Sequence, residues 1–298
     1  MSIRQELVSA ATKAGGSFKS IDDRKRHANQ LADYLMANNI QIRTLEQLKQ
    51  KHVMGWIAAA KDDGNKDRSL QNKLTSVRTL LRAVGLDRKA DAILTKEFGC
   101  DNACRDGVRQ ALPRPTIMAM IKQVKATDPG VGACLDLQAS LGLRQLEAIR
   151  CGILDTLIRW ERELCVLGGR VRVLEGTKGK RERFVLPVNR EETLLAVREA
   201  ITVAKRHKGG RLIVNPNLKS TVNHYNYEAA KVGFVGLHSP HSLRYAWAQY
   251  AYERYLAAGL SEREAAIAVA LDLGHGDGRG RFIKRVYCQT KHQPIKNL

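Results

Sequence analysis

The chain has 298 residues, 44% of them hydrophobic, so it is long enough for two globular domains and too apolar to be disordered. Its 50 Lys and Arg against 30 Asp and Glu give a formal charge of +20. The excess is shared by residues 1–105, with 19 basic and 12 acidic residues, and by the remainder, with 31 and 18. A surplus in both halves favours one long polyanion as partner over a generic solubility charge.

No apolar run approaches the roughly 18 residues of a membrane span, and the N-terminus lacks the apolar core of a signal peptide. We therefore expect a cytoplasmic protein with no membrane partner, in which thiols stay reduced. The six cysteines are scattered without a paired CxxC and are interpreted as small hydrophobic residues rather than zinc ligands: Cys100, Cys104, Cys134, Cys151, Cys165 and Cys288.

Cap signals and periodic apolar residues predict a helical bundle over the first hundred residues. Ser2 with Gln5 and Thr44 with Gln47 have the spacing of capping boxes. An amphipathic run over 70–84 follows Ser69 and is closed by a glycine. Helices over 21–38 and 87–98 complete the bundle.

Basic residues gather at the helix starts and loops of this part. Free backbone N–H groups at a helix start favour phosphate, so these residues are candidate contacts to the polyanion. A solvated charged face is an equally good interpretation of any one of them: Arg24, Lys25, Arg26, Lys66, Arg68, Lys73 and Arg78.

The stretch CDNACRDGVRQALPRP, residues 100–115, is polar and aperiodic and ends in two prolines. Such a stretch predicts a linker, because proline resists continuation of a helix. We place the boundary near residue 108, which defines a helical domain over 1–108 and a second domain over 109–298.

The second domain is predicted to mix helices with a small sheet. Helices are expected over 116–127, 131–140, 190–207, 220–232, 242–258 and 261–273, with a short helix ending at 151. Strands are expected over 163–167 and 170–174, joined as a hairpin by two glycines, and over 183–188. The fold class is therefore mainly α with a small β-sheet.

Four segments of this domain carry chemically active side chains: LGLRQLEAIR, GTKGKRERFVLP, SPHSLRYAWA and LGHGDGRGRFIKRVY. In this order they resemble the catalytic domain of the tyrosine recombinases, the family of phage and mobile-element integrases and Xer-type resolvases. The resemblance covers about residues 110–298. The first domain resembles the family's helical core-binding domain, which is SAM-like.

Arg144 and Arg244 each follow a turn at the start of a predicted helix. Two planar guanidiniums suit the non-bridging oxygens of a phosphodiester under attack. Glu147, three residues after Arg144, lies on the same helical face and is expected to orient it or a neighbour.

His241 and His275 are expected to hydrogen-bond the phosphate and to assist proton transfer, since histidine is readily tuned near neutral pH. His238 is close in sequence, and three histidines also suggest a metal site. No carboxylate or cysteine has a convincing ligand spacing, so we predict no metal and no cofactor.

Lys178 matches the hairpin lysine of the family, which the resemblance makes the general acid for the 5′-hydroxyl. Lys180 is close enough to take that role instead, and a lysine in a turn is commonly only solvated.

Tyr287 is the single tyrosine after His275, and the resemblance makes it the nucleophile. A phenol, with a pKa of about 10, needs a nearby base or positive field. The other tyrosines of this region are expected to pack within a helix, although Tyr245 stands where many family members have a histidine. Residues 276–286 form a longer Gly/Arg-rich loop than is usual, expected to let the tyrosine helix move or to place Arg279 and Arg281 on DNA.

The resemblance implies a site-specific DNA recombinase that cleaves and rejoins strands through a 3′-phosphotyrosine link. It further implies four protomers on two double-stranded attachment sites, a Holliday-junction intermediate, and accessory DNA-bending proteins as further partners. We expect an integrase of a mobile element, associated with the nucleoid when bound to DNA, whose last eleven residues pack on a neighbouring protomer. Integration, excision and resolution use the same residues, so the direction stays open.

Three alternatives remain. A type IB topoisomerase has a similar constellation and acts as a monomer, but the small helical first domain favours the recombinase. A DNA-binding regulator with a degenerate recombinase fold would lack an active-site group, whereas all six positions are filled here. A metal-dependent nuclease would be sensitive to chelators.

Overall fold

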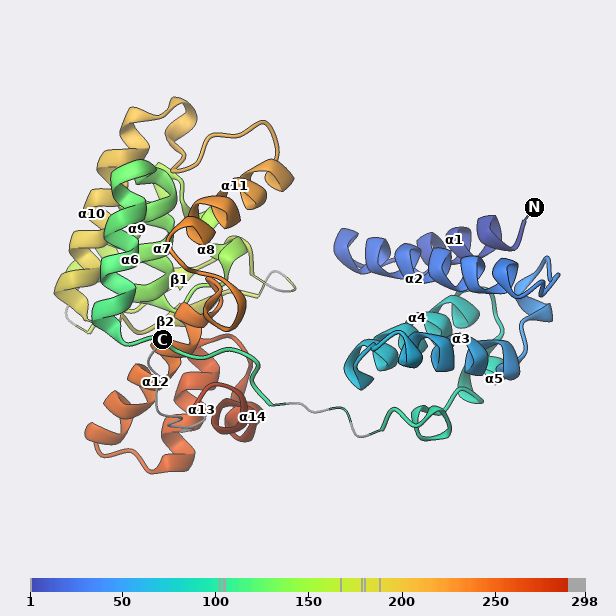
Figure 1. Ribbon diagram of the computed structural model, residues 1–298. Coiled ribbons are helices and arrows are strands. Elements are labelled where there is room, and N and C mark those ends of the chain that lie inside the picture. The colour runs from blue at the N-terminus through green and yellow to red at the C-terminus, as the bar shows by residue number, and fades with distance from the viewer. Residues whose placement is uncertain are drawn as a thin grey trace, which may run out of the picture. The chain divides into compact units, whose positions relative to one another are not determined.

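The computed structural model describes residues 2–101, 103, 106–166, 168–177, 179, 181–187 and 189–288. The chain divides into two compact units, residues 1–105 and 106–298 (Figure 1). Each unit has its own buried apolar core. Within the described ranges, no helix is both long enough and apolar enough to cross a membrane.

The first unit is a bundle of α-helices: α1 Ile3–Lys13, α2 Phe18–Ala37, α3 Gln50–Asp62, α4 Asp67–Ala83 and α5 Asp87–Asp91. The Ser2–Gln5 capping box starts α1 as predicted. The predicted helix over 87–98 is wrong in its second half. The N–H of Ile93 bonds to the carbonyl of Ala90, three residues back, so the α-helical ladder ends and a 3-10 turn, Thr95–Phe98, follows. This break lets Ile93 and Phe98 both enter the core.

The second unit contains the remaining helices: α6 Arg114–Thr127, α7 Pro129–Leu141, α8 Gln145–Cys151, α9 Leu154–Cys165, α10 Arg190–Arg206, α11 Leu218–Lys231, α12 Ser242–Ala257, α13 Glu262–Asp272 and α14 Gly280–Val286. Residues 130–141 of α7 are all buried, because α6, α8, α10, α11 and α12 pack around this helix. The centre of this unit is thus a helix that is buried on every side, with Asp136, Gln138 and Ser140 as its buried polar residues.

The sheet consists of β1 Val171–Val173 and β2 Arg183–Val185, paired antiparallel with Val173 opposite Arg183. Side chains alternate across the pleat, so that the middle residue of each strand is exposed and the outer ones are buried. An arginine therefore occupies an inward position of β2. The rest of the predicted strand 183–188 is not paired, and Val188 lies outside the described residues.

The predicted strand over 163–167 is wrong, because residues 163–165 form the end of α9. Leu157, Trp160 and Leu164 recur at helical spacing and are fully buried, which stabilises a helix there. The two glycines 168 and 169 consequently lead from a helix into β1 and do not join two strands.

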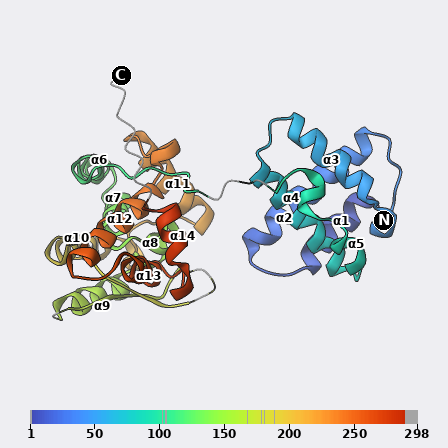
Figure 2. The same cartoon turned by 90° about the horizontal axis from the view of Figure 1, so that it is seen from below.

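The predicted loop over 276–286 is also wrong for most of its length. A 3-10 turn, Asp277–Arg279, runs directly into α14, which buries Ile283 and Val286, three residues apart. This helix packs on α13, and α13 packs on α12 (Figures 1 and 2). Tyr287 is the residue that ends α14.

Candidate active site

The turn that follows α13 is the meeting point of two arginines. The backbone carbonyl of Leu273 accepts hydrogen bonds from Nη2 of Arg144, at 3.2 Å, and from Nη2 of Arg244. Arg244 also donates to the carbonyl of Gly142, which ends α7. Carbonyl groups at helix C-terminal ends carry partial negative charge and stabilise cations. The fold thereby holds the two predicted phosphate ligands side by side.

Glu147 lies at the centre of these cations and is fully buried. It accepts from the backbone N–H of Arg144 at 2.7 Å, from Nη1 of Arg144 at 2.6 Å, and from Nη2 of Arg183 at 2.6 Å. Nη1 of Arg244 lies 3.9 Å from the same carboxylate. One carboxylate among three guanidiniums leaves the cluster net positive, as a phosphate site requires.

The ionised state of Glu147 is secured by its neighbours. Burial acts to raise its pKa, but the charges of Arg183, Arg244 and Arg144 and the hydrogen bond from Arg183 outweigh it and hold the pKa at about 2. Burial lowers the pKa of Arg244 to about 9, with Arg183 and Arg144 acting in the same direction, so this guanidinium is still charged at neutral pH.

Arg183 is the functional candidate that sequence reasoning missed. It is 4% exposed, bonds to Glu147 through Nη2 and donates through Nη1 to the backbone carbonyl of Asp272. The available signal was its place in ERFVLP, where alternation turns residue 183 inward together with Val185. A charged residue at an inward strand position is a sign of a buried ion pair.

A second polar network, formed by Asp272, Tyr255 and Arg170, stabilises the same turn. The buried carboxylate of Asp272 accepts from the hydroxyl of Tyr255 at 2.7 Å and from Arg170, which also bonds to that hydroxyl at 2.9 Å. Burial raises the pKa of Asp272, against the hydrogen bond from Tyr255 and the charge of Arg170. The network fixes the end of α13, on which the guanidiniums depend.

His275 lies two residues beyond the shared carbonyl, and its Nε2 is 3.3 Å from the hydroxyl of Tyr287. Burial, followed by the charges of Arg244 and Arg144, lowers the pKa of His275 to about 3. The imidazole is therefore neutral at pH 7. In the tautomer protonated at Nδ1, Nε2 can accept the phenolic hydrogen.

His241 precedes α12 at the rim of this cluster. His241 is an exposed residue, yet its ring packs against that of Tyr245 in a T-shaped arrangement with centroids 5.7 Å apart. This partial burial, with the charges of Arg244 and Arg109, lowers the pKa of His241 to about 4. His241 thus presents a neutral imidazole on the accessible side of the cluster.

Tyr287 is 4% exposed and packs against aromatic rings. Its ring centroid is 4.6 Å from that of Tyr245 and 6.1 Å from that of Phe282, and its backbone carbonyl accepts from the amide of Gln249 at 3.0 Å. Tyr245, which the sequence placed in the core, therefore forms part of the wall around the proposed nucleophile.

The first residues of the second unit close over the end of α14. A β-carbon at Gly107 would lie 2.0 Å from the carbonyl oxygen of Val286 and 3.0 Å from Cε1 of Tyr245, so only glycine fits this approach. Asp106 forms an ion pair with Arg285 at 2.7 Å, and Nη1 of Arg109 donates to the carbonyl of Gly236 at 2.6 Å. The end of the predicted linker is thus built into the site.

The structure brings six predicted residues together: Arg144, Glu147, His241, Arg244, His275 and Tyr287. Lys178 and Lys180 lie outside the described residues, as does the tail over 289–298. Gly176, two residues before Lys178, is packed against α8: a β-carbon there would lie 2.6 Å from the carbonyl oxygen of Leu146. His238 instead faces the backbone of Gln110, with Nδ1 3.3 Å from its carbonyl oxygen.

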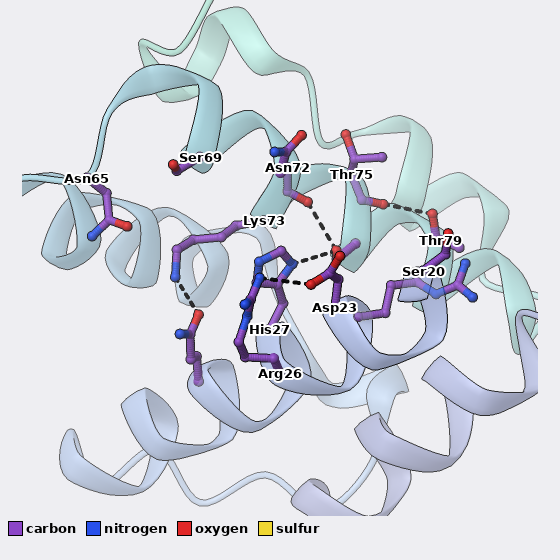
Figure 3. Close-up of a pocket in the computed structure, with 13 residues that line it drawn as sticks. Ser20, Asp23, Arg26, His27, Asn65, Ser69, Asn72, Lys73, Thr75 and Thr79 are labelled. Carbon is purple, nitrogen blue, oxygen red and sulfur yellow. Dashed lines mark hydrogen bonds and ion pairs between the residues drawn. The ribbon is translucent and has the colours of Figure 1, made fainter. Parts of the chain in front are cut away.

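The first unit contains a polar pocket of about 590 Å³ between α2 and α4 (Figure 3). Of the seven basic residues predicted to contact a polyanion, Arg24, Arg26 and Lys73 line it, whereas the other four do not: Lys25, Lys66, Arg68 and Arg78. Neutral polar residues that were not predicted as contacts share the lining and repeat at helical spacing beside the basic ones: His27, Gln30, Ser69, Asn72 and Ser76.

Lys73 is the most buried cation of this pocket, at 7% exposure. Its Nζ donates to the amide oxygen of Gln30 at 2.5 Å and lies 4.9 Å from the ring centroid of Trp56. Burial, then the charge of Arg26, lowers its pKa. His27 beside it bonds to Ser76 at 2.7 Å, and burial followed by the charge of Lys73 lowers its pKa to about 4.

Arg279 and Arg281 occupy exposed positions of the 3-10 turn and of α14. Arg279 is close enough to contribute to the lowered pKa of His275. In the described part of the chain, no three His, Cys, Asp or Glu side chains gather as metal ligands.

A mainly helical unit with a small sheet, in which two arginines, two histidines and a tyrosine converge on one turn, defines a tyrosine recombinase catalytic domain. Residues 99–250 match the family model described as integrase, and residues 1–90 match the model described as phage integrase, N-terminal. The chain belongs to this integrase family of tyrosine recombinases and is a site-specific recombinase. The family match ends at residue 250, before His275 and Tyr287. The choice of these two residues as site candidates is therefore based on the sequence motif and on their geometry.

Solved integrases have the same fold. The Tn1549 transposon integrase, in complex with transposon right end DNA, aligns with a TM-score of 0.59 at 15% identity, covering 95% of this chain and 94% of that one. A lambda integrase tetramer bound to a Holliday junction aligns with a TM-score of 0.57 at 17% identity, covering 100% and 80%. No curated protein sequence gives a significant match. The predicted family and fold class are confirmed, and the topoisomerase and regulator alternatives are not favoured.

Proposed function

We propose that this recombinase cleaves DNA through attack of the Tyr287 hydroxyl on a phosphorus held by Arg144 and Arg244. The observation that carries the proposal is the contact of 3.3 Å between that hydroxyl and Nε2 of His275, beside two guanidiniums on one carbonyl. A neutral base, a phenol and fixed positive charge are the parts that phosphoryl transfer to a side chain needs.

The guanidiniums retain hydrogen-bonding capacity for a phosphate. Each terminal nitrogen carries two N–H groups, and the bonds of Arg244 to Gly142 and Leu273 use one on each. The side chain of Arg144 is 25% exposed, so it meets an incoming phosphate first. His241 lies at the same rim and donates a further hydrogen bond in our proposal.

The proposed step is balanced without a cofactor. In the proposed step the negative charge of the bound phosphate offsets the arginine charges that lower the pKa of His275, and the phenolic proton passes to Nε2 of His275 as the bond from the tyrosine oxygen to phosphorus forms. The bond from phosphorus to the 5′-oxygen breaks, and that oxygen takes a proton from the hairpin lysine, Lys178 by resemblance or else Lys180. The product is a 3′-phosphotyrosine with a free 5′-hydroxyl, and the reverse reaction with another 5′-hydroxyl rejoins the strand.

Access to the nucleophile requires a change around α14. With 4% of Tyr287 exposed, a phosphodiester cannot approach its hydroxyl in line until the aromatic wall or the segment 106–110 shifts. In the proposed mechanism, DNA binding causes that shift. Without DNA the tyrosine stays buried and therefore unreactive.

The polarity of the covalent link tests this proposal. On an attachment-site duplex nicked beside the cleavage position and held in EDTA, we expect a protein-linked strand that retains a 5′ label. The released fragment should accept phosphate from polynucleotide kinase without prior phosphatase treatment, because it carries a 5′-hydroxyl. A complex that retains only a 3′ label, or cleavage that appears only with added magnesium, would refute the proposed chemistry.

We further propose that the α2–α4 pocket of the first unit contacts DNA, with Lys73 on a phosphate. Its lining combines three cations, of which Arg26 is paired with Asp23 at 3.0 Å, with amide and hydroxyl groups able to bond to base edges. This role is that of the core-binding domain, and the catalytic unit would bind the same duplex.

The Lys73→Gln variant should weaken DNA binding about five- to tenfold and reduce the slope of log affinity against log salt by about one. Fluorescence anisotropy over a salt series measures both quantities. Lys51→Gln, an exposed lysine of α3 outside the pocket, is the matched control. An unchanged salt slope for Lys73→Gln, with an unchanged melting temperature, would remove Lys73 from the phosphate contacts.

Assembly follows from the same proposal. The lambda integrase neighbour is a tetramer on a Holliday junction, and another is a dimer on a core site. We propose four protomers on two attachment sites for this chain as well, with accessory DNA-bending proteins, in the cytoplasm and on the nucleoid. The role of an integrase of a mobile element is part of this proposal.

A further inference from the structure

We infer that Arg183 is a positioning residue that locks the β-hairpin, which carries the proposed general acid in its turn, to the pair of guanidiniums that hold the phosphate. The inference rests on the proposed function of Tyr287 and of the hairpin lysine. It connects the strand that follows the lysine-bearing segment to the groups that we propose to stabilise charge on the phosphate.

Arg183 bridges two anchors that the catalytic arginines also use. Its Nη2 bonds to Oε2 of Glu147 at 2.6 Å, and the other oxygen of that carboxylate accepts from Arg144. Its Nη1 donates to the carbonyl of Asp272, immediately before the Leu273 carbonyl that receives both Arg144 and Arg244. A displacement of Arg183 would therefore move both supports of the guanidinium pair.

Close packing joins the hairpin to the same two elements. A β-carbon at Gly274, where φ is +68°, would lie 2.9 Å from Cδ of Arg183. On the other side, a β-carbon at Gly176 would lie 2.9 Å from Cα of Glu147. Gly176 is thus packed against α8, and Arg183 is packed against the turn that follows α13.

Arg183 acts through its neighbours and not on DNA. Its two terminal nitrogens bond to Glu147 and to the carbonyl of Asp272, which are the supports of the proposed phosphate-binding pair, Arg144 and Arg244. Within the described residues its Nε is buried without a hydrogen-bond partner, which is unfavourable for folding. A position selected for stability alone would be better filled by apolar residues, so the ion pair points to a functional requirement.

The geometry demands a guanidinium. A planar fork can bond to a carboxylate with one nitrogen and to a carbonyl with the other, whereas the ammonium of lysine is a single point. Arg183→Lys keeps the charge but loses one anchor. Arg183→Met removes the charge and both hydrogen bonds while keeping a similar volume.

The test compares two substrates. One is the ordinary nicked attachment site, and the other has sulfur in place of the 5′-bridging oxygen at the cleaved position. A thiolate leaves without protonation, so the second substrate does not need the general acid. The matched control is Arg172→Lys, which changes an exposed arginine on the opposite strand of the same hairpin, ion-paired with Glu182.

We expect Arg183→Lys to form the covalent complex with the ordinary substrate about a hundredfold more slowly than wild type, the scale of a misplacement of about 1 Å. Most of that loss should disappear with the sulfur substrate. Arg183→Met should show a larger loss of rate on the ordinary substrate. The sulfur substrate should restore that rate only in part, because the guanidinium pair is also disturbed. Arg172→Lys should stay within about twofold of wild type on both substrates.

Rescue by the sulfur substrate cannot come from a misfolded enzyme, so it separates positioning from stability. Equal losses on both substrates would overturn the inference, since Arg183 would then act without involving the hairpin. Wild-type rates for Arg183→Lys and Arg183→Met would also overturn it. If wild type itself forms no complex with either substrate, while still binding the DNA, the proposed function is refuted, and this inference is refuted with it.

Discussion

Tyr287→Phe should abolish the covalent protein–DNA complex, with a loss of more than about a thousandfold, the scale for deleting a nucleophile. The variant removes one hydroxyl and its contact to His275 while the ring stays packed against Tyr245 and Phe282. Folding and DNA affinity should therefore be preserved. A nicked attachment site in EDTA, followed by a denaturing protein gel, gives the result as a shifted band.

Tyr245→Phe is the matched control for this experiment. Tyr245 is 5% exposed, and its ring lies 4.6 Å from that of Tyr287, so the same atom is removed from a neighbouring buried phenol. We expect it to retain the covalent band. A band that persists in Tyr287→Phe and disappears in Tyr245→Phe would mean that the nucleophile is on α12.

Glu147→Gln should lower the free energy of unfolding of the second unit by about 3 kcal/mol at pH 7 and slow cleavage about a hundredfold. Three guanidiniums lose their shared negative charge, and the carboxylate bonds to Arg144 and Arg183 are weakened. The stability estimate follows from the lowering of the pKa from 4.5 to about 2 in a fully buried group.

The pH dependence of that loss has a definite sign. A folded-state pKa below the unfolded value stabilises the protein at every pH above about 4.5, and the stabilisation disappears as the pH falls from 4.5 towards 2. The free energy of unfolding of wild type should therefore approach that of Glu147→Gln as the pH falls. Two curves that remain parallel from pH 7 to pH 3 would show that Glu147 is not the coupled group.

Urea unfolding followed by tryptophan fluorescence measures this effect. The chain has three tryptophans, of which Trp160 and Trp247 report on the second unit, so a Trp56→Phe background isolates that unit. Glu228→Gln is the control, because it removes a buried carboxylate of the same unit that pairs with the half-exposed Lys231 at 2.7 Å. Its loss should stay below about 1 kcal/mol.

The principal side chains of the candidate site could be found without coordinates. Arg144, Arg244, His241, His275 and Tyr287 stand in short segments whose order and spacing are typical of the family, and the structure brings them to one turn. The residue types follow from the reaction, since a phosphodiester under attack demands guanidinium, imidazole and a nucleophile. Local sequence carries this information directly.

Long-range contacts, in contrast, could not be found in this way. Arg183 was assigned only to a strand, because nothing in ERFVLP reveals that Glu147 and the end of α13 meet it. Gly107 was assigned only to a linker, although its lack of a side chain lets the chain pass against Val286 and Tyr245. The segment around Glu163 was predicted as a strand, whereas burial of Trp160 and Leu164 in the core makes it a helix.

The sequence by itself determined the class of protein and the fold class, and it supplied the side chains that we propose to react. These properties depend on residue types and on spacing along the chain. Only the tertiary structure decided that one buried carboxylate lies among three arginines, that Tyr287 is buried, and that Arg183 of the hairpin bonds to both Glu147 and the end of α13. Such features arise from packing between elements far apart in sequence, where burial and the exclusion of water make a single ion pair decisive.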